Sequence, residues 1–252
     1  MFAFVISLPN AMDRRSFMEI QLRQLGIPFE FFDAILGSKY IHDPAYYDDR
    51  LSRKLEDRSL RPGEVGCALS HAAVYAEIVK RGLPWALILE DDAILHHDLP
   101  KVLDALENGK LNQGDLVFLE RCDHYKWGSK RPLWGKFSIV EPILVRLGNN
   151  AQAAGYVVTA KAADAMRNVN IPVHFPADNW GYYRGLINFK GVIPTLTLIR
   201  QVTSFDSQTA TNKRRAPFHK YCIVTYWWYG FKVYTSLGRR LKHMAKKILG
   251  RE

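Results

Sequence analysis

The stretch LPWALILEDDAILHHDLP, residues 83–100, joins a strand-like apolar run to a cluster of acids. The run 85–89 has the length and composition of a buried strand, and it continues directly into Glu90, Asp91 and Asp92. Ligands of open α/β sheets bind beyond the carboxyl ends of the strands. The position of the three acids therefore predicts a binding site at the end of a core strand.

The segments around this strand predict an α/β fold. Residues 2–8 form a β-rich run that closes at Pro9, a helix is expected from Asp13 to Gly26, and a second strand is expected at 28–35. A strand–helix–strand order with this spacing predicts parallel pairing. Further elements are expected as a helix at 64–82, a short helix at 101–111, and strands at 115–120 and 191–202.

The charge of the chain is concentrated near its end. The net charge is +10, and residues 213–252 hold eleven Lys/Arg and one acid, whereas the other 212 residues hold 24 of each sign. We therefore expect a neutral catalytic domain over 1–212 and a basic tail over 213–252. A nucleic-acid-binding protein is one alternative suggested by the charge, but the basic residues form no stripe on the main domain.

The cysteines and the apolar runs predict a cytoplasmic protein. The three cysteines are far apart and form no C-x-x-C pair, which suits a reducing compartment better than a disulfide framework. The start of the chain has no basic leader, and no segment has the roughly 20 apolar residues of a membrane-spanning helix.

The acidic triplet suits a divalent cation. If the strand pattern continued, Glu90 and Asp92 would point to one side and Asp91 to the other. Neighbouring carboxylates repel each other unless a positive charge lies between them, and hard oxygen ligands favour magnesium or manganese. We expect Glu90 and Asp92 to be the metal ligands. The alternative is a water-exposed acidic turn.

Several phrases of the chain, taken together and in order, resemble glycosyltransferase family 25. The phrases are FVISLPNAMDRRS (4–16), PFEFFDAILG (28–37), PGEVGCALSHAAVY (62–75), ALILEDDAIL (86–95), AAGYVVTAKAADAM (153–166) and PADNW (176–180). The resemblance implies a GT-A-like, Rossmann-type mixed sheet flanked by helices. It also implies inverting transfer of a hexose, usually galactose, from a UDP-sugar to a saccharide in lipooligosaccharide synthesis, with manganese as the expected cofactor and magnesium as the alternative.

The resemblance also assigns the residues that bind the nucleotide. Ser7 and Leu8 would contact the uridine, and Arg14 or Arg15 the ribose or a phosphate. Further contacts are expected from the residues Asp33, Ser70, His71 and Asp91.

Inversion requires a general base, for which Asp178 is the first candidate and Glu120 the second. The rings of Trp180, Tyr182 and Tyr183 would stack on a sugar. Residues of the following polar segment are candidates for completing the metal shell or binding the diphosphate, namely Asp206, His219, Lys213, Arg214 and Arg215.

The tail combines aromatic residues at 226–231 with a basic amphipathic helix expected from Leu237 onward. This pattern is typical of a helix that lies on an anionic bilayer, so residues 221–252 are expected to bind the inner face of the bacterial inner membrane. Packing of the helix on the enzyme itself is the alternative. A metal-dependent phosphohydrolase, suggested by His96 and His97 after the acids, is the rival enzymatic function.

Overall fold

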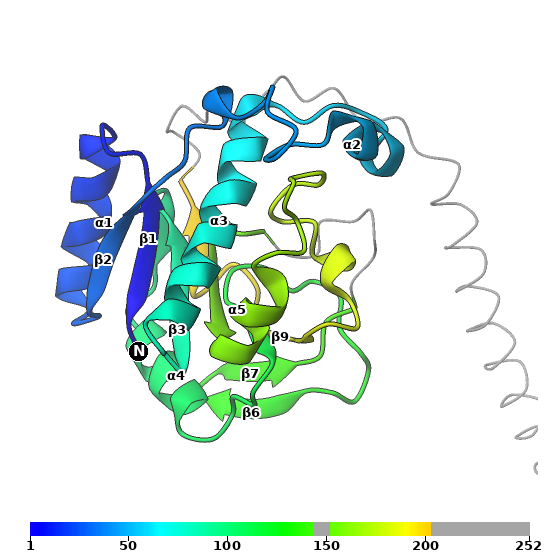
Figure 1. The fold of residues 1–252 in the computed structure, drawn as a ribbon. Coiled ribbons are helices and arrows are strands. Elements are labelled where there is room, and N and C mark those ends of the chain that lie inside the picture. The colour runs from blue at the N-terminus through cyan, green and yellow to red at the C-terminus, as the bar shows by residue number, and fades with distance from the viewer. Residues whose placement is uncertain (144–151, 203–252) are drawn as a thin grey trace, which may run out of the picture. The chain divides into compact units, whose positions relative to one another are not determined.

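The computed structural model describes residues 1–143 and 152–202, in which an eight-stranded sheet has the order β2-β1-β3-β8-β5-β9-β7-β6 (Figure 1). The strands are β1 (Ala3–Ser7), β2 (Phe29–Asp33), β3 (Trp85–Glu90), β5 (Asp115–Phe118), β6 (Arg131–Trp134), β7 (Phe137–Val140), β8 (Gly155–Thr159) and β9 (Asn188–Ile193). A second, two-stranded sheet pairs β4 (Ala93–Leu95) with β10 (Ile199–Gln201).

The predicted strand–helix–strand unit at the start of the chain is confirmed. β1 pairs in parallel with β2 and with β3, so that Ser7 lies opposite Asp33 and Ile6 opposite Glu90. β8 is antiparallel to both of its neighbours, β3 and β5, which makes the sheet mixed. Because β3 and β5 are both antiparallel to β8, they run in the same direction, and their carboxyl ends lie at the same edge of the sheet.

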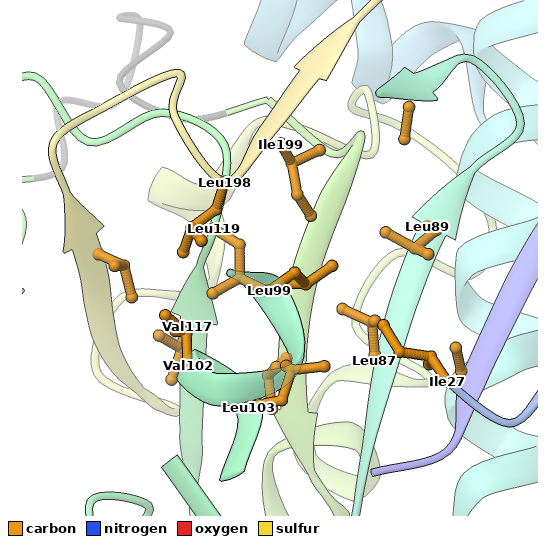
Figure 2. Close-up of a cluster of buried hydrophobic side chains, with 14 of the residues drawn as sticks. Ile27, Leu87, Leu89, Leu99, Val102, Leu103, Val117, Leu119, Leu198 and Ile199 are labelled. Carbon is orange, nitrogen blue, oxygen red and sulfur yellow. The ribbon is translucent and has the colours of Figure 1, made fainter. Parts of the chain in front are cut away.

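Helices cover both faces of the sheet, which confirms the predicted mixed α/β fold. Alternate strand residues contact different helices, as the two-residue period of a strand requires. Val5, Leu87 and Leu89 pack with α1 (Met12–Gln24) and α4 (Leu99–Glu107). Figure 2 shows Leu99, Val102 and Leu103 of α4 in this cluster, near Val117, Leu119, Leu198 and Ile199.

The opposite face packs against α3 (Pro62–Lys80) and α5 (Ala160–Met166), which lie in front of the sheet in Figure 1. Phe4 and Ile88 contact this layer, together with Tyr156. A shorter helix, α2 (Asp49–Glu56), and two 3-10 turns, η1 (Gly37–Lys39) and η2 (Trp180–Tyr183), complete the described elements.

Some predicted boundaries are wrong. The strand expected at 191–202 is two strands, because Pro194 has no N–H to continue the ladder and β9 ends before it. The first helix has Ala11 as its N-cap, and Asp13, the expected cap, lies in the first turn. Helix α2 and the β6–β7 hairpin have no counterpart in the sequence prediction.

None of the helices in the described part of the chain is long and apolar enough to span a bilayer. The expected boundary at 212 and the tail at 213–252 lie outside the described residues, as do the candidates Asp206, His219, Lys213, Arg214 and Arg215.

Candidate functional site

A cleft of about 670 Å³ lies at the carboxyl edge of the sheet. It is bounded by the ends of β1 and β3, the loop after β2, the start of α3 and the segment before η2. Of the ten first-choice residues for the metal, the nucleotide and the general base, nine line the cleft: Ser7, Leu8, Arg14, Ser70, His71, Glu90, Asp91, Asp92 and Asp178. The sheet topology thus brings together residues that are up to 171 positions apart, from Ser7 to Asp178.

Asp33 is the tenth of these residues and does not line the cleft, and neither do the alternatives Arg15 and Glu120. Its side chain is 67% exposed and forms an ion pair with Arg15. Arg15 also donates to the backbone carbonyl oxygens of Ser7 (3.0 Å) and Leu8 (3.2 Å). These contacts tie the ends of β1 and β2 together beside the cleft, and contact between Asp33 and a nucleotide stays a prediction.

One guanidinium group holds two of the three acids. Arg14 contacts the Asp91 carboxylate at 2.9 Å and the Asp92 carboxylate at 3.0 Å. Ser7 Oγ donates to Asp91 at 2.7 Å, which links the ends of β1 and β3. The expected alternation of the triplet is therefore wrong, because β3 ends at Glu90 and the two aspartates belong to the turn that follows.

Glu90 faces α3 instead of Arg14. Its Oε1 lies 3.6 Å from His71 Nε2 and 3.8 Å from the Cys67 sulfur, and its Oε2 accepts from Gln201 Nε2 at 3.2 Å. Cys67 and Gln201 were not singled out from the sequence. Cys67 precedes His71 by four positions, and this spacing alone predicts that the two residues share a face of the helix. Gln201 reaches the cleft only because β10 pairs with β4, which no local sequence pattern predicts.

The far side of the His71 ring is fixed by two buried hydroxyl groups. His71 Nδ1 lies 2.7 Å from the Tyr156 hydroxyl, which in turn lies 2.7 Å from the hydroxyl of Tyr75. These three side chains are almost completely buried. The ring consequently presents Nε2 to the cleft and to Glu90.

The cleft holds more negative charge than its cations balance. Burial, followed by the charge of Glu90, raises the pKa of Asp92 to about 6 and that of Asp178 to about 6. Burial and the same charge raise the pKa of Glu120 to about 8. Glu90 is the common source of repulsion, so a cation placed near it would stabilise the ionised form of all three groups.

The donor set fits a hard divalent cation. Asp92 Oδ1 is buried and has no hydrogen-bond partner among the described residues, while the other oxygen is held by Arg14. Glu90 and Asp92 line the same cleft and offer carboxylate oxygens, the ligands that manganese and magnesium accept. A divalent ion bound here would contact the buried Asp92 oxygen that lacks a partner and would offset the excess negative charge of the cleft.

The aromatic residues after Asp178 do not provide the expected stacking surface. Trp180 and Tyr183 are 3% and 4% exposed, and Trp180 packs edge-on against Phe118 and Tyr156 in the core. Tyr182 stacks on Phe175. The prediction that these rings stack on a sugar is therefore wrong for Trp180 and Tyr183, because the apolar rings fill the core beneath the cleft.

Asp178 and Glu120 occupy different environments. Asp178 lines the cleft, whereas Glu120 is 1% exposed and is absent from the cleft lining. Burial and the charge of Glu90 raise the pKa of Glu120 to about 8, so its protonated form predominates at neutral pH when no cation lies near Glu90. Geometry and charge thus favour Asp178 as the base.

Comparison with known proteins confirms the family resemblance that was inferred from the six sequence phrases. Residues 1–180 match the family described as "Glycosyltransferase family 25 (LPS biosynthesis protein)". The lipooligosaccharide biosynthesis protein lic2B of Haemophilus influenzae is 31% identical over 167 residues, covering 63% of this chain and 59% of that protein. The inactive glycosyltransferase 25 family member 3 of Homo sapiens is 35% identical over 132 residues, or 47% of this chain and 21% of that protein.

The procollagen galactosyltransferase 1-B of Xenopus laevis is 33% identical over 132 residues, which cover 47% of this chain and 21% of that protein. The chain therefore spans from about a fifth to about three fifths of the length of these relatives. The matched region contains β1, α3, the acidic triplet and Asp178, which are the parts that build the cleft. Because the match extends over residues 1–180 of 252, the chain belongs to glycosyltransferase family 25.

Proposed function

We propose that the chain is an active, metal-dependent, inverting hexosyltransferase that moves galactose from a UDP-sugar to a saccharide acceptor in lipooligosaccharide synthesis. The observation that carries the proposal is the cleft, where Glu90, Asp92 and Asp178 lie at the carboxyl edge of the sheet and burial raises the pKa of Asp92 to about 6. The names of the bacterial relative and of the procollagen galactosyltransferase support the acceptor class and the sugar.

In this proposal each group of the cleft has a distinct task. Ser7 and Leu8, at the end of β1, would contact the nucleoside, and Arg14 would carry positive charge to the diphosphate side. Manganese or magnesium, held by Glu90 and Asp92, would neutralise charge on the leaving diphosphate. Binding of the nucleotide and of the metal requires no movement of the sheet, because all of these side chains already line the cleft.

The transfer step would place the acceptor hydroxyl near Asp178. Asp178 removes the hydroxyl proton as the oxygen forms its bond to the anomeric carbon. The bond from that carbon to the diphosphate oxygen breaks on the opposite face, and its electron pair leaves with UDP. Attack opposite to departure inverts the configuration at the anomeric carbon.

The test is turnover of a panel of UDP-sugars with manganese, with magnesium and with EDTA. We expect one donor, UDP-galactose, to be used only when metal is present, and Asp92→Asn to lose most of the activity. Asp104→Asn is the matched control, since Asp104 is exposed on α4 and away from the cleft. No turnover of any donor by the wild-type chain, with added metal, would reject the proposal.

The same assay separates the rival phosphohydrolase function, which would release phosphate without transferring sugar. The rival rested on His96 and His97, and neither residue lines the cleft. Binding of residues 221–252 to the anionic inner membrane remains part of the proposal. It is tested by sedimenting the full chain with anionic vesicles, neutral vesicles or DNA at physiological salt, where binding to anionic vesicles alone is expected.

A further inference from the structure

Three side chains of different chemistry converge at the floor of the cleft. Cys67 and His71 lie one helical turn apart on α3, and Glu90 ends β3. The Cys67 sulfur, His71 Nε2 and a Glu90 carboxylate oxygen all lie within 4.8 Å of one another. This donor set is a thiol, an imidazole and one carboxylate, and it differs from the all-oxygen set expected at Asp92.

The spacing of the donors is close to that of a tetrahedral metal site. Zinc binds sulfur at roughly 2.3 Å and nitrogen or oxygen at roughly 2.0–2.1 Å, so neighbouring tetrahedral ligands lie about 3.3–3.6 Å apart. Glu90 Oε1 lies 3.6 Å from His71 Nε2 and 3.8 Å from the Cys67 sulfur. The two contacts of Glu90 are therefore within a few tenths of an ångström of tetrahedral spacing, and the Cys67 sulfur and the His71 nitrogen lie within 4.8 Å of each other.

The donors are also oriented in the way that metal ligands are. His71 is 2% exposed, and its Nε2 has no hydrogen-bond partner among the described residues and faces Glu90. Its other nitrogen is held by Tyr156, the kind of outer contact that fixes the ring of a ligating histidine. Gln201 holds the second oxygen of Glu90 and leaves Oε1 toward Cys67 and His71.

We propose that Cys67, His71 and Glu90 form a second cation site, which takes a borderline-soft divalent ion such as Zn²⁺. Binding forms a metal–sulfur bond and releases the thiol proton to solvent. It also requires a free electron pair on Nε2, so the imidazole proton lies on Nδ1 and is donated to Tyr156. The three residues line the cleft, which leaves the fourth coordination position open to it.

Glu90 belongs to both donor sets, and this makes the two ions competitors. A zinc ion held by Cys67 and His71 would withdraw Glu90 from the manganese or magnesium ligands. On the basis of the proposed function, zinc would inhibit sugar transfer, and added manganese would relieve the inhibition. Zinc binding itself does not depend on that function.

The test is a titration of the metal-free full chain with Co²⁺, which absorbs strongly in the near ultraviolet when a thiolate binds it. We expect one such band per chain, abolished by stoichiometric Zn²⁺. The band should disappear in Cys67→Ser and persist in Cys122→Ser, because Cys122 is buried away from the cleft. It should also persist in Asp92→Asn, which removes a ligand of the oxygen site alone.

Glu90→Gln is a second test that keeps the thiol. Its band should remain while the affinity for Co²⁺ falls by at least about 10-fold, the smallest effect typical of losing even an outer contact of a ligand. A band of unchanged intensity in Cys67→Ser, or no thiolate band in the wild type, would overturn the site. If the band behaves as expected but no sugar transfer is found, the cation site stands and the proposed function fails.

Discussion

The Nδ1 atom of His71 lies 2.7 Å from the hydroxyl oxygen of Tyr156. Burial raises the pKa of Tyr156 and that of Tyr75 well above the usual range, so both hydroxyl groups keep their protons. In the metal-free protein, when Tyr75 donates to Tyr156 and Tyr156 donates to Nδ1, neutral His71 carries its proton on Nε2. That proton faces the Glu90 carboxylate, whose negative charge favours this direction of the two hydrogen bonds. Zinc binding at Nε2 would move this proton to Nδ1 and make Tyr156 its acceptor.

Replacing Tyr156 with Phe tests this arrangement. His71 Nδ1 loses its donor in a buried site, so we expect the free energy of unfolding to fall by about 1–3 kcal/mol. The ring proton is then free to occupy either nitrogen, which ¹⁵N chemical shifts of His71 report directly. Urea unfolding gives the stability change.

Tyr75→Phe is the matched control for this prediction. It leaves the contact between Tyr156 and His71 in place, so the ¹⁵N shifts should keep the pattern of a proton on Nε2. Unchanged shifts in Tyr156→Phe would show that Glu90 alone fixes the ring proton, contrary to the proposed role of the hydroxyl.

Gly37 allows the start of α3 to approach the loop after β2. A Cβ atom at Gly37 would lie 1.9 Å from the Pro62 carbonyl oxygen and 2.4 Å from the Gly66 nitrogen, both backbone atoms. Gly37→Ala should therefore separate the two segments and lower the free energy of unfolding by about 1–3 kcal/mol, the range for overpacking. Thermal or urea unfolding measures the change.

Ser38→Ala provides the neighbouring control, because Ser38 is exposed and the change should stay within about 0.5 kcal/mol. Gly37 and Gly66 also line the cleft, so separation of the segments should weaken nucleotide binding as well. A Gly37→Ala chain as stable as the wild type would show that the two segments can move apart freely.

The sequence predicts the edge of the sheet better than the details of the site. Local signals suffice for β1, α1 and β2, and for the end of β3, because an apolar run and a turn residue identify each of them. Parallel pairing then brings Ser7 and Glu90 to one edge. This is why nine of the ten first-choice residues line a single cleft.

Other features depend on tertiary contacts that no local pattern records. Arg14 becomes the partner of Asp91 and Asp92 only when α1 packs beside β3. Trp180 enters the core because Phe118 and Tyr156, from two other strands, form its pocket. Single-sequence patterns give the type of residue at these positions but not what it faces.

The buried carboxyl of Glu120 makes stability depend on pH. Its pKa is raised to about 8, above the unfolded value of 4.5, so the folded protein holds a proton that the unfolded chain releases between these values. The free energy of unfolding therefore falls as the pH rises from about 5 to about 8. Glu120→Gln, which mimics the protonated side chain, should abolish this part of the fall.

We expect Glu120→Gln to match the wild type near pH 5 and to exceed its stability by on the order of 4 kcal/mol at pH 9. Urea unfolding at several pH values measures the difference. Glu141→Gln is the control, because Glu141 is an exposed glutamate directly after β7. Equal pH dependence in the wild type and in Glu120→Gln would mean that Glu120 is ionised in the folded protein.

If Asp178 is the base of the proposed transfer, its ionisation governs the pH dependence of the reaction. A general base must be ionised, and burial with the charge of Glu90 raises the pKa of Asp178 to about 6. Because a cation held by Glu90 would lower this pKa, the value of kcat/KM for sugar transfer should rise with pH and level off at or below about 6. Asp178→Asn should lower it by about 100- to 10,000-fold, the range for loss of a general base.

Two variants separate Asp178 from the other acids of the cleft. Glu120→Gln should retain activity at neutral pH, because Glu120 does not line the cleft. Asp92 also has a raised pKa of about 6, so a rise near pH 6 that persists in a fully active Asp178→Asn enzyme would belong to Asp92. That outcome would remove Asp178 as the base, whereas loss of both the activity and the pH-dependent rise ties proton removal to its carboxylate.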